Sequence, residues 1–299
     1  MSVTGLLYIP KLNPLRFHQV NLGDFWQNQI PSSDYQDVKY CQLVNAGDIF
    51  YLQFLAAFDM TTADTVVTLI DNDLTVIDTY TVVDNGAYGD LTSFYIKDYF
   101  PVTTGVHYVK ITINYADASA SFLSEPINIG THTDTIFMMY RHSQSILDCK
   151  FGGVDLPMFY LRVKGGLKSD GFSPGGKYTM YNDLDFRPVM LQTQPYNLYK
   201  WTFGDGRGIP NWVAERINLA FSLDYTFIDN VQYMRNEGAK LEVNRDGNFP
   251  MAGWSLETLR VDNAYSEAFT SGGATIHDGT WDDGRVVDDE KIFSKDESP

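Results

Sequence analysis

The chain has 299 residues, of which 44% are hydrophobic, so it can bury the cores of two ordinary domains and is too apolar to be disordered as a whole. Its 38 Asp and Glu outnumber 22 Lys and Arg, and the net charge of −16 argues against sequence-independent binding of nucleic acid. The chain lacks a run of about 18 apolar residues, so we expect no membrane span, and the composition of Met1–Gly5 leads us to expect no secretory signal.

The first half of the chain alternates between apolar and polar residues in the manner of antiparallel strands. Asp71-Asn72-Asp73 has the composition of a hairpin turn between two such runs. The expected strands are residues 49–55, 65–70, 74–80, 106–115, 119–129 and 135–140, the last of which closes the region. Short strands at this spacing predict an immunoglobulin-like β-sandwich with an N-terminal extension over residues 1–147. The Cys–Trp–Cys core of antibody domains is absent, so only the architecture is implied.

The second half predicts an α+β assembly domain over residues 148–265, followed by an acidic extended arm over residues 266–299. Residues 210–223 form the one convincing helix, because apolar residues recur there at helical spacing after Pro210. The other expected elements are strands at 158–163, 186–193, 196–203, 240–244 and 254–261, a Gly/Pro loop at 170–177 and a hairpin at 226–234. The fold class is therefore mainly β.

Two glycine-rich stretches approach nucleotide-binding motifs but lack required residues. Gly171–Tyr178 ends with Tyr178 where a phosphate-binding loop needs Ser or Thr, and no helical pattern follows. Gly204–Gly208 lies between a strand and the helix, yet Ile209 occupies the close-packing position and Asp205 would repel a pyrophosphate. A tight turn that requires positive φ explains the second stretch, and we expect no cofactor.

Metal and catalytic patterns are also missing from the sequence. The five histidines have no metal-binding spacing, and Asp71–Asp73 lacks the glycine and distal glutamate of a calcium loop. The two cysteines, Cys41 and Cys149, are interpreted as reduced thiols. We therefore expect no metal site, no catalytic residues and no enzymatic activity.

Several blocks together resemble proteins encoded by phages and prophages of gut Bacteroidetes, including crAss-like phages. The likeness covers roughly residues 100–260 and is carried by Thr135–His142, Phe159–Gly166, Lys200–Ile217 and Asn236–Asn244. The resemblance implies a virion protein of the tail, neck ring or distal tail, made in the bacterial cytoplasm and assembled as a symmetric ring around a DNA channel. It implies no catalytic residues.

The leading hypothesis is a ring subunit that contacts copies of itself and other tail or neck proteins, without sequence-specific nucleic-acid binding. Head-to-tail contacts close into a ring when the rotation between subunits permits. The candidate subunit interface consists of Gly204, Asp205, Gly206, Arg207, Gly208, Trp212, Asp282, Asp283, Asp288 and Asp289.

Two other hypotheses belong to different functional classes. A receptor- or glycan-binding module at the tail tip would use aromatic faces around a groove, from Tyr178, Tyr181, Tyr196, Tyr199, Trp201 and Trp254. An enzyme, for instance a glycan depolymerase, would need a constellation of catalytic residues that the sequence does not offer.

Overall fold

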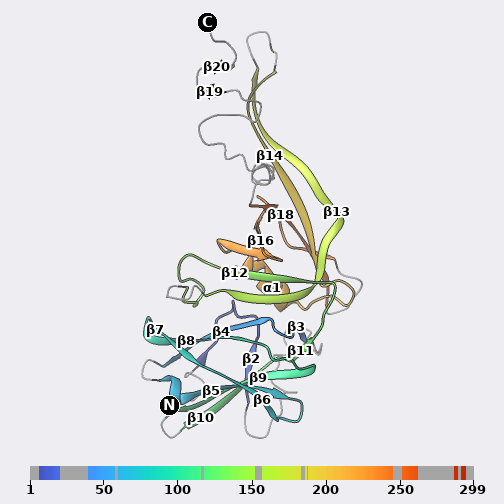
Figure 1. Ribbon diagram of the computed structural model, residues 1–299. Coiled ribbons are helices and arrows are strands. Elements are labelled where there is room, and N and C mark those ends of the chain that lie inside the picture. The colour runs from blue at the N-terminus through green and yellow to red at the C-terminus, as the bar shows by residue number, and fades with distance from the viewer. Residues whose placement is uncertain are drawn as a thin grey trace.

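The computed structural model describes residues 7–20, 40–57, 60–115, 118–151, 157–182, 186, 188–244, 251–261, 286–288 and 291–293. These residues form a mainly β structure, with α1 (Asn211–Ala220) as the single α-helix among them. Figure 1 shows the N-terminal half at the bottom, the second half above it and a long hairpin that projects from the top.

The N-terminal half consists of two sheets packed face to face. One contains β1 (Leu7–Tyr8), β4 (Ile49–Ala57), β8 (Leu91–Tyr99) and β7 (Val83–Tyr88) in that order. The other contains β3 (Gln42–Asn45), β11 (Ile127–Gly130), β9 (Gly105–Tyr115), β10 (Ala118–Ser124) and β2 (Phe17–Val20), with β5 (Thr65–Asp71) and β6 (Val76–Tyr80) attached to β9. A short 3-10 turn at Thr62–Asp64 leads into β5.

Alternating side chains of the two sheets form the core of this sandwich. Phe54 and Phe94 of one sheet and Val109 and Ile111 of the other are fully buried in one cluster. The Asp71 turn joins β5 to β6 as expected, because its carboxylate accepts hydrogen bonds from the N–H groups of Asp73 and Thr75. The arrangement is compatible with an immunoglobulin-like order, but that identity stays a prediction.

The second half is a small barrel. Successive antiparallel pairings join β12 (Thr135–Arg141), β15 (Tyr225–Ile228), β16 (Val231–Arg235), β18 (Gly253–Arg260), β14 (Pro188–Phe203) and β13 (Phe159–Asn182), and β13 pairs back with β12. A further strand, β17 (Glu242–Asn244), adds to β18. Because β13 pairs with β12, these six strands form a closed barrel without an open edge where they pair.

The strand at 135–140 was expected to close the sandwich, and that placement is wrong. β12 pairs with β13 and β15, and its inward residues Ile136, Met138 and Tyr140 belong to the core of the second half. Its burial alternates strictly along the strand, which fits either sheet equally, so local pattern could not assign it.

Two further expectations for the second half are corrected. The Gly/Pro loop at 170–177 is the middle of β13, and the two strands at 186–193 and 196–203 are one strand, β14. β13 and β14 pair from Gly165–Phe203 to Asn182–Pro188 and make one long hairpin. Glycine and proline are tolerated here because most of this ribbon does not lie in the centre of a sheet, where each strand pairs on both sides.

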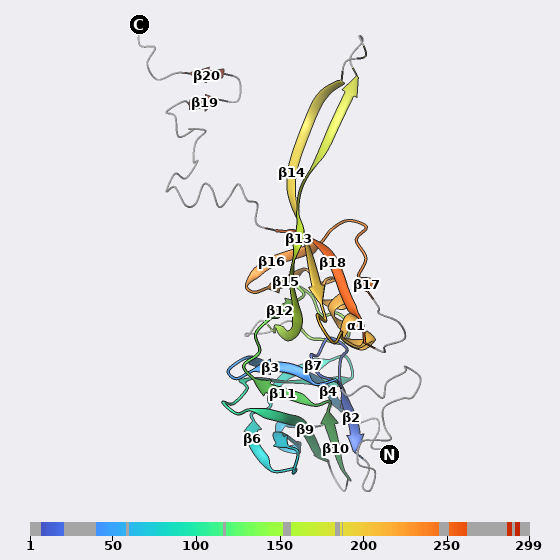
Figure 2. The same cartoon turned by 90° about the vertical axis from the view of Figure 1, so that its right-hand side faces the viewer.

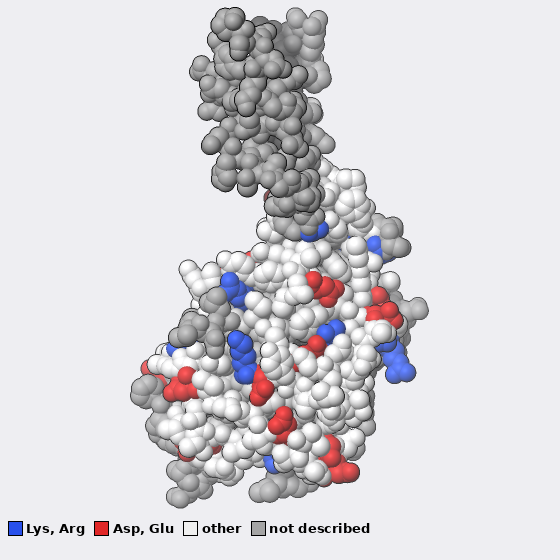
Figure 3. Space-filling view, viewed as in Figure 1, with Lys and Arg blue, Asp and Glu red and all other residues white. Residues whose placement is uncertain are grey.

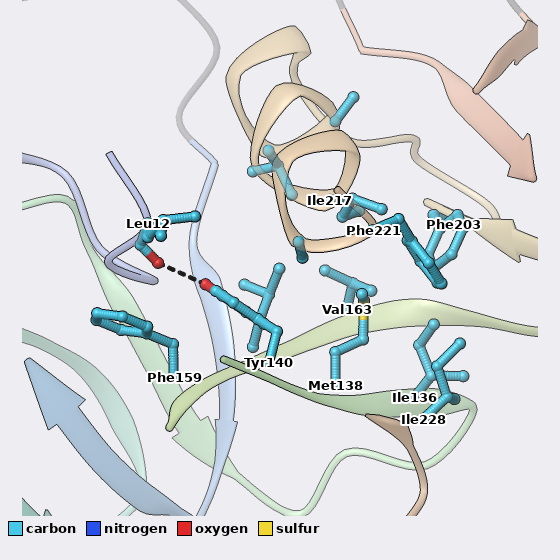
Figure 4. Packing of buried hydrophobic residues seen from close by; sticks show 14 of the residues in the cluster. Leu12, Ile136, Met138, Tyr140, Phe159, Val163, Phe203, Ile217, Phe221 and Ile228 are labelled. Carbon is cyan, nitrogen blue, oxygen red and sulfur yellow. Dashed lines mark hydrogen bonds between the residues drawn. The ribbon is translucent and has the colours of Figure 1, made fainter. Parts of the chain in front are cut away.

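The helix packs against the barrel strands and contributes side chains to their core. α1 begins after Pro210, which is its N-cap, and ends at Ala220 rather than at 223. Val213, Ile217 and Ala220 are fully buried in the same cluster as Phe203 and Val163, and Figure 4 shows Ile217 and Phe221 facing these strands. The expected apolar face is confirmed.

The end of the chain is described only in part. Two short strands, β19 (Val286–Asp288) and β20 (Lys291–Phe293), pair with each other within the expected acidic arm.

No helix among the described residues is long and apolar enough to cross a membrane. Acidic and basic side chains are interspersed over the face of the body shown in Figure 3.

A segment near the N-terminus joins the two halves. Leu12 and Asn13 are fully buried, Leu12 in the barrel cluster, while Leu15 lies in the sandwich cluster. The Leu12 carbonyl accepts a hydrogen bond from Tyr140 Oη at 2.6 Å, drawn in Figure 4. The Asn13 side chain exchanges two 2.8 Å hydrogen bonds with the backbone of Gln53.

We predict that Asn13→Ala lowers the free energy of unfolding by about 2–3 kcal/mol, because it leaves the buried backbone groups of Gln53 without partners. Urea unfolding measures the change. Lys11→Ala is the matched control, since Lys11 is an exposed neighbour in the same segment, and it should change the stability little. Equal effects of both changes would contradict this account of the segment.

Candidate assembly interface

The most prominent surface feature is the outer part of the β13–β14 hairpin, which we call the projecting hairpin (residues 172–199). It stands clear of the body in Figure 2. Along it, β13 and residues 188–197 of β14 pair only with each other among the described residues. An isolated two-stranded ribbon is marginally stable in water, so this element needs further contacts.

Large apolar side chains are exposed on the projecting hairpin. Phe186 at the tip is 85% exposed, and Met180 and Tyr181 are 60% and 49% exposed. Successive strand residues point to opposite faces, so Met180 and Tyr181 place apolar groups on both faces of the ribbon. Several large exposed apolar side chains on one element favour a contact site.

A row of aromatic rings anchors the hairpin to the barrel. Trp201 and Tyr233 are buried and meet edge to face at 5.3 Å between centroids. Tyr233 contacts Tyr199 at 5.6 Å, and Tyr199 contacts Phe172 at 5.5 Å, where the ribbon leaves the body. The row therefore extends the rigid core into the root of the hairpin.

The predicted interface loop, Gly204–Gly208, is a tight turn between β14 and α1. Gly204, Gly206 and Gly208 have φ values of +83°, +81° and +80°, so the expectation that glycine supplies positive φ here is confirmed. Asp205 accepts a hydrogen bond from Thr202 Oγ1 at 3.0 Å. Arg207 is exposed and makes no ion pair with another described residue, so it is accessible to a partner.

The other predicted interface residues are dispersed. Trp212 lies half-buried against its own chain, with the guanidinium groups of Arg16 and Arg216 at 4.2 Å and 5.0 Å from the centre of its ring. Asp282, Asp283 and Asp289 fall outside the described residues. Asp288 ends β19, and nothing further is described for its side chain.

A buried carboxylate holds Arg16 and Arg216 together beside Trp212. Glu125 Oε2 lies 3.4 Å from Arg16 Nε, and Glu125 Oε1 lies 3.9 Å from Arg216 Nη1. Burial raises the pKa of Glu125 to about 7, against the opposing effect of the two guanidinium charges and the hydrogen bonds from Arg16. The cluster joins the sandwich, the N-terminal segment and α1, so it organises the junction between the halves.

A shallow groove of about 370 Å³ runs beside α1. Its walls include Glu215 and Asn218 of the helix, Arg235 at the end of β16, Lys240 beyond that strand, and Trp254 of β18. Arg235 Nη2 donates a 2.7 Å hydrogen bond to Asn218 Oδ1. No group of three or more His, Cys, Asp and Glu side chains suited to a metal occurs in the described part of the chain.

Sequence reasoning missed the projecting hairpin and the Glu125 cluster. The hairpin could have been expected from the two strand-like stretches on either side of residues 183–187, a segment whose sequence holds two Asp residues. The Glu125 cluster joins residues that are far apart in the chain, and no local pattern points to it. Comparison with protein-family models, curated proteins and solved structures finds no match.

We predict that Gly208→Ala destabilises the protein by about 1–3 kcal/mol more than Gly206→Ala does. A Cβ at Gly208 would lie 2.7 Å from the Ala252 nitrogen, whereas a Cβ at Gly206 meets nothing within 4 Å. Both glycines have nearly the same positive φ, so the difference between the two melting curves reports mainly on the steric contact. Indistinguishable variants would show that this turn can move away from β18.

The Glu125 pKa predicts an unusual pH dependence of stability. Because the folded-state pKa is raised from 4.5 to about 7, the protonated form contributes stability that is fully present below pH 4.5 and is lost as the pH rises through about 7. Between pH 5 and 8 the wild type should lose about 1–3 kcal/mol relative to Glu125→Gln, measured by urea unfolding. A constant difference across this range would contradict the assigned pKa.

Proposed function

We propose that this chain is a structural subunit of a bacteriophage particle, assembled as an oligomeric ring in the tail or neck around the DNA channel. The protein would act by assembly and not by catalysis. The projecting hairpin is the observation that carries the proposal, and the sequence resemblance to virion proteins of Bacteroidetes phages supplies its context.

The hairpin supports assembly because its exposed apolar surface has no use in an isolated subunit. Burying apolar surface away from water stabilises an assembly by about 25 cal/mol per Å². Covering exposed side chains such as Phe186 and Met180 therefore favours association. The aromatic row at its root holds the hairpin in one orientation, which lowers the entropic cost of binding.

The acidic composition is compatible with a channel for DNA. A subunit with a net charge of −16 offers phosphate few favourable contacts, so DNA can pass without being retained. The hairpin lies at the opposite end of the molecule from the sandwich in Figure 1, so it extends away from the body of its own subunit.

The groove beside α1 favours one alternative, a receptor- or glycan-binding module at the tail tip. Trp254 lines the groove together with amide and charged side chains, a combination that suits sugars. Trp201 does not belong to such a site, because it is 7% exposed and packs in the barrel core. Glycan binding that is lost in Trp254→Ala, with the fold retained, would favour this alternative.

The double change Met180→Ser with Tyr181→Ser should leave the chain folded but weaken its self-association, which native mass spectrometry measures. Both side chains are exposed, so their removal costs little stability in the free subunit. Leu74→Ser with Val76→Ser is the matched control, because these sandwich residues are 51% and 56% exposed and lie away from the hairpin. The control should assemble like the wild type.

Proteomic analysis of purified phage particles provides the test of location. The proposal expects the chain as a constituent at a fixed copy number relative to the other tail proteins. Its absence from intact particles would refute the virion function, whatever the chain does when purified.

A further inference from the structure

We infer that the groove beside α1 binds a sugar that carries one carboxylate group. The groove is separate from the proposed assembly surface, because none of its described lining residues belongs to the projecting hairpin. Its volume of about 370 Å³ is in the range of sites for small ligands. The site would therefore serve the chain in addition to assembly.

Arg235 is a half-buried cation without an anionic partner in this groove. It makes no ion pair with another described residue, and its Nη2 donates hydrogen bonds of 3.0 Å and 2.7 Å to two uncharged oxygens of Asn218. Burial lowers the pKa of the Arg235 guanidinium, because the charge is partly withdrawn from water and no anion offsets the loss. A charge in this position is stabilised by pairing, so the groove favours a ligand with a negative group.

Two N–H groups of the lining residues lack acceptors. Arg235 Nε and Trp254 Nε1 are buried and have no hydrogen-bond partner in the described part of the chain. Unpaired buried donors destabilise a structure and are rare in native proteins. Because both atoms are donors, the missing groups are acceptors, such as the oxygens of a carboxylate or a hydroxyl. A ligand reaches them after rotation of a side chain, and no hydrogen bond of the Trp254 ring opposes this rotation.

The remaining charged side chains of the groove limit the charge of the ligand. Lys240 and Glu215 are exposed, and neither forms an ion pair within the described ranges of the chain. Two cations and one anion leave the groove with one net positive charge, in a chain whose net charge is −16. One carboxylate balances this charge, whereas a doubly charged phosphate exceeds it and is repelled by Glu215.

The same side chains favour a sugar over a simple organic acid. Trp254 places an aromatic ring beside the cations, and such a ring packs against the C–H surface of a pyranose. Glu215 adds an acceptor, so the ligand needs hydroxyl donors as well as the oxygens that Arg235 binds. A sugar acid supplies a ring, hydroxyl groups and one carboxylate in a single small molecule.

Titration of the full chain with methyl β-D-glucuronide and methyl β-D-glucoside tests the site, because the two differ only in a carboxylate against a hydroxymethyl group. The chain carries isotope-labelled tryptophan, and the Trp254 indole N–H signal is identified by its loss in Trp254→Phe. We expect the glucuronide to shift this signal saturably and the glucoside to bind at least about tenfold more weakly, a ratio that corresponds to about 1.4 kcal/mol. The signal of Trp201 should stay in place, because Trp201 lies in the barrel core.

Charge-removing variants test which side chains hold the carboxylate. Arg235→Gln should weaken binding of the glucuronide at least about tenfold, because a charge-assisted hydrogen bond is lost. Lys240→Gln should weaken it about two- to fivefold, and its exposed position keeps the fold intact where Arg235→Gln fails to fold. Lys11→Gln is the matched control, since Lys11 is an exposed lysine that does not line the groove, and it should bind like the wild type.

Three results would overturn the assignment. Equal affinity for the two glycosides would show that the groove does not recognise the carboxylate, and an unmoved Trp254 signal with both would remove the site. Tighter binding of inorganic phosphate than of the glucuronide would show a general anion site without selectivity for sugars. All of these results leave the proposed ring function standing, and absence of the chain from phage particles would refute that function without changing the groove.

Discussion

The pairing of β13 with β14 is the constraint on which the rest of the structure depends. The inner residues of these strands close the barrel, and their outer residues form the projecting hairpin, so one antiparallel ladder serves both core and surface. Because Trp201 and Phe203 are buried in the barrel, the direction of the hairpin is set by the core and not by a flexible loop. A ribbon held in this way can act as an assembly element with little loss of entropy on binding.

The junction between sandwich and barrel gives the molecule its second rigid connection. Arg162 of β13 forms two 2.7 Å hydrogen bonds with the Asp48 carboxylate beside β4, and Glu125 joins Arg16 to Arg216 of α1. Buried ion pairs contribute little net stability but are costly to break, so they define one relative orientation of the two halves. The sandwich would therefore move with the barrel and the hairpin as one unit in an assembly.

The sequence predicted what depends on local periodicity. The apolar spacing from Val213 to Ile217 placed the helix, and the Asp71 turn chemistry placed the β5–β6 hairpin. The sequence was misleading where one residue type occurs in two kinds of structure. Pro174, Gly175 and Pro195 suggested a loop and a strand break, although a free ribbon accommodates proline at outward positions and covers glycine with Tyr196. β12 and the Glu125 cluster depend on pairings between distant segments, which no local pattern contains.

Cryo-electron microscopy of intact phage particles tests the central claim most directly, namely that the hairpin mediates ring assembly. The account predicts a closed ring of this chain around the axial channel, with each projecting hairpin covered by a neighbouring subunit. A single copy or a peripheral cluster at a fibre tip, with the hairpins exposed to solvent, would contradict it.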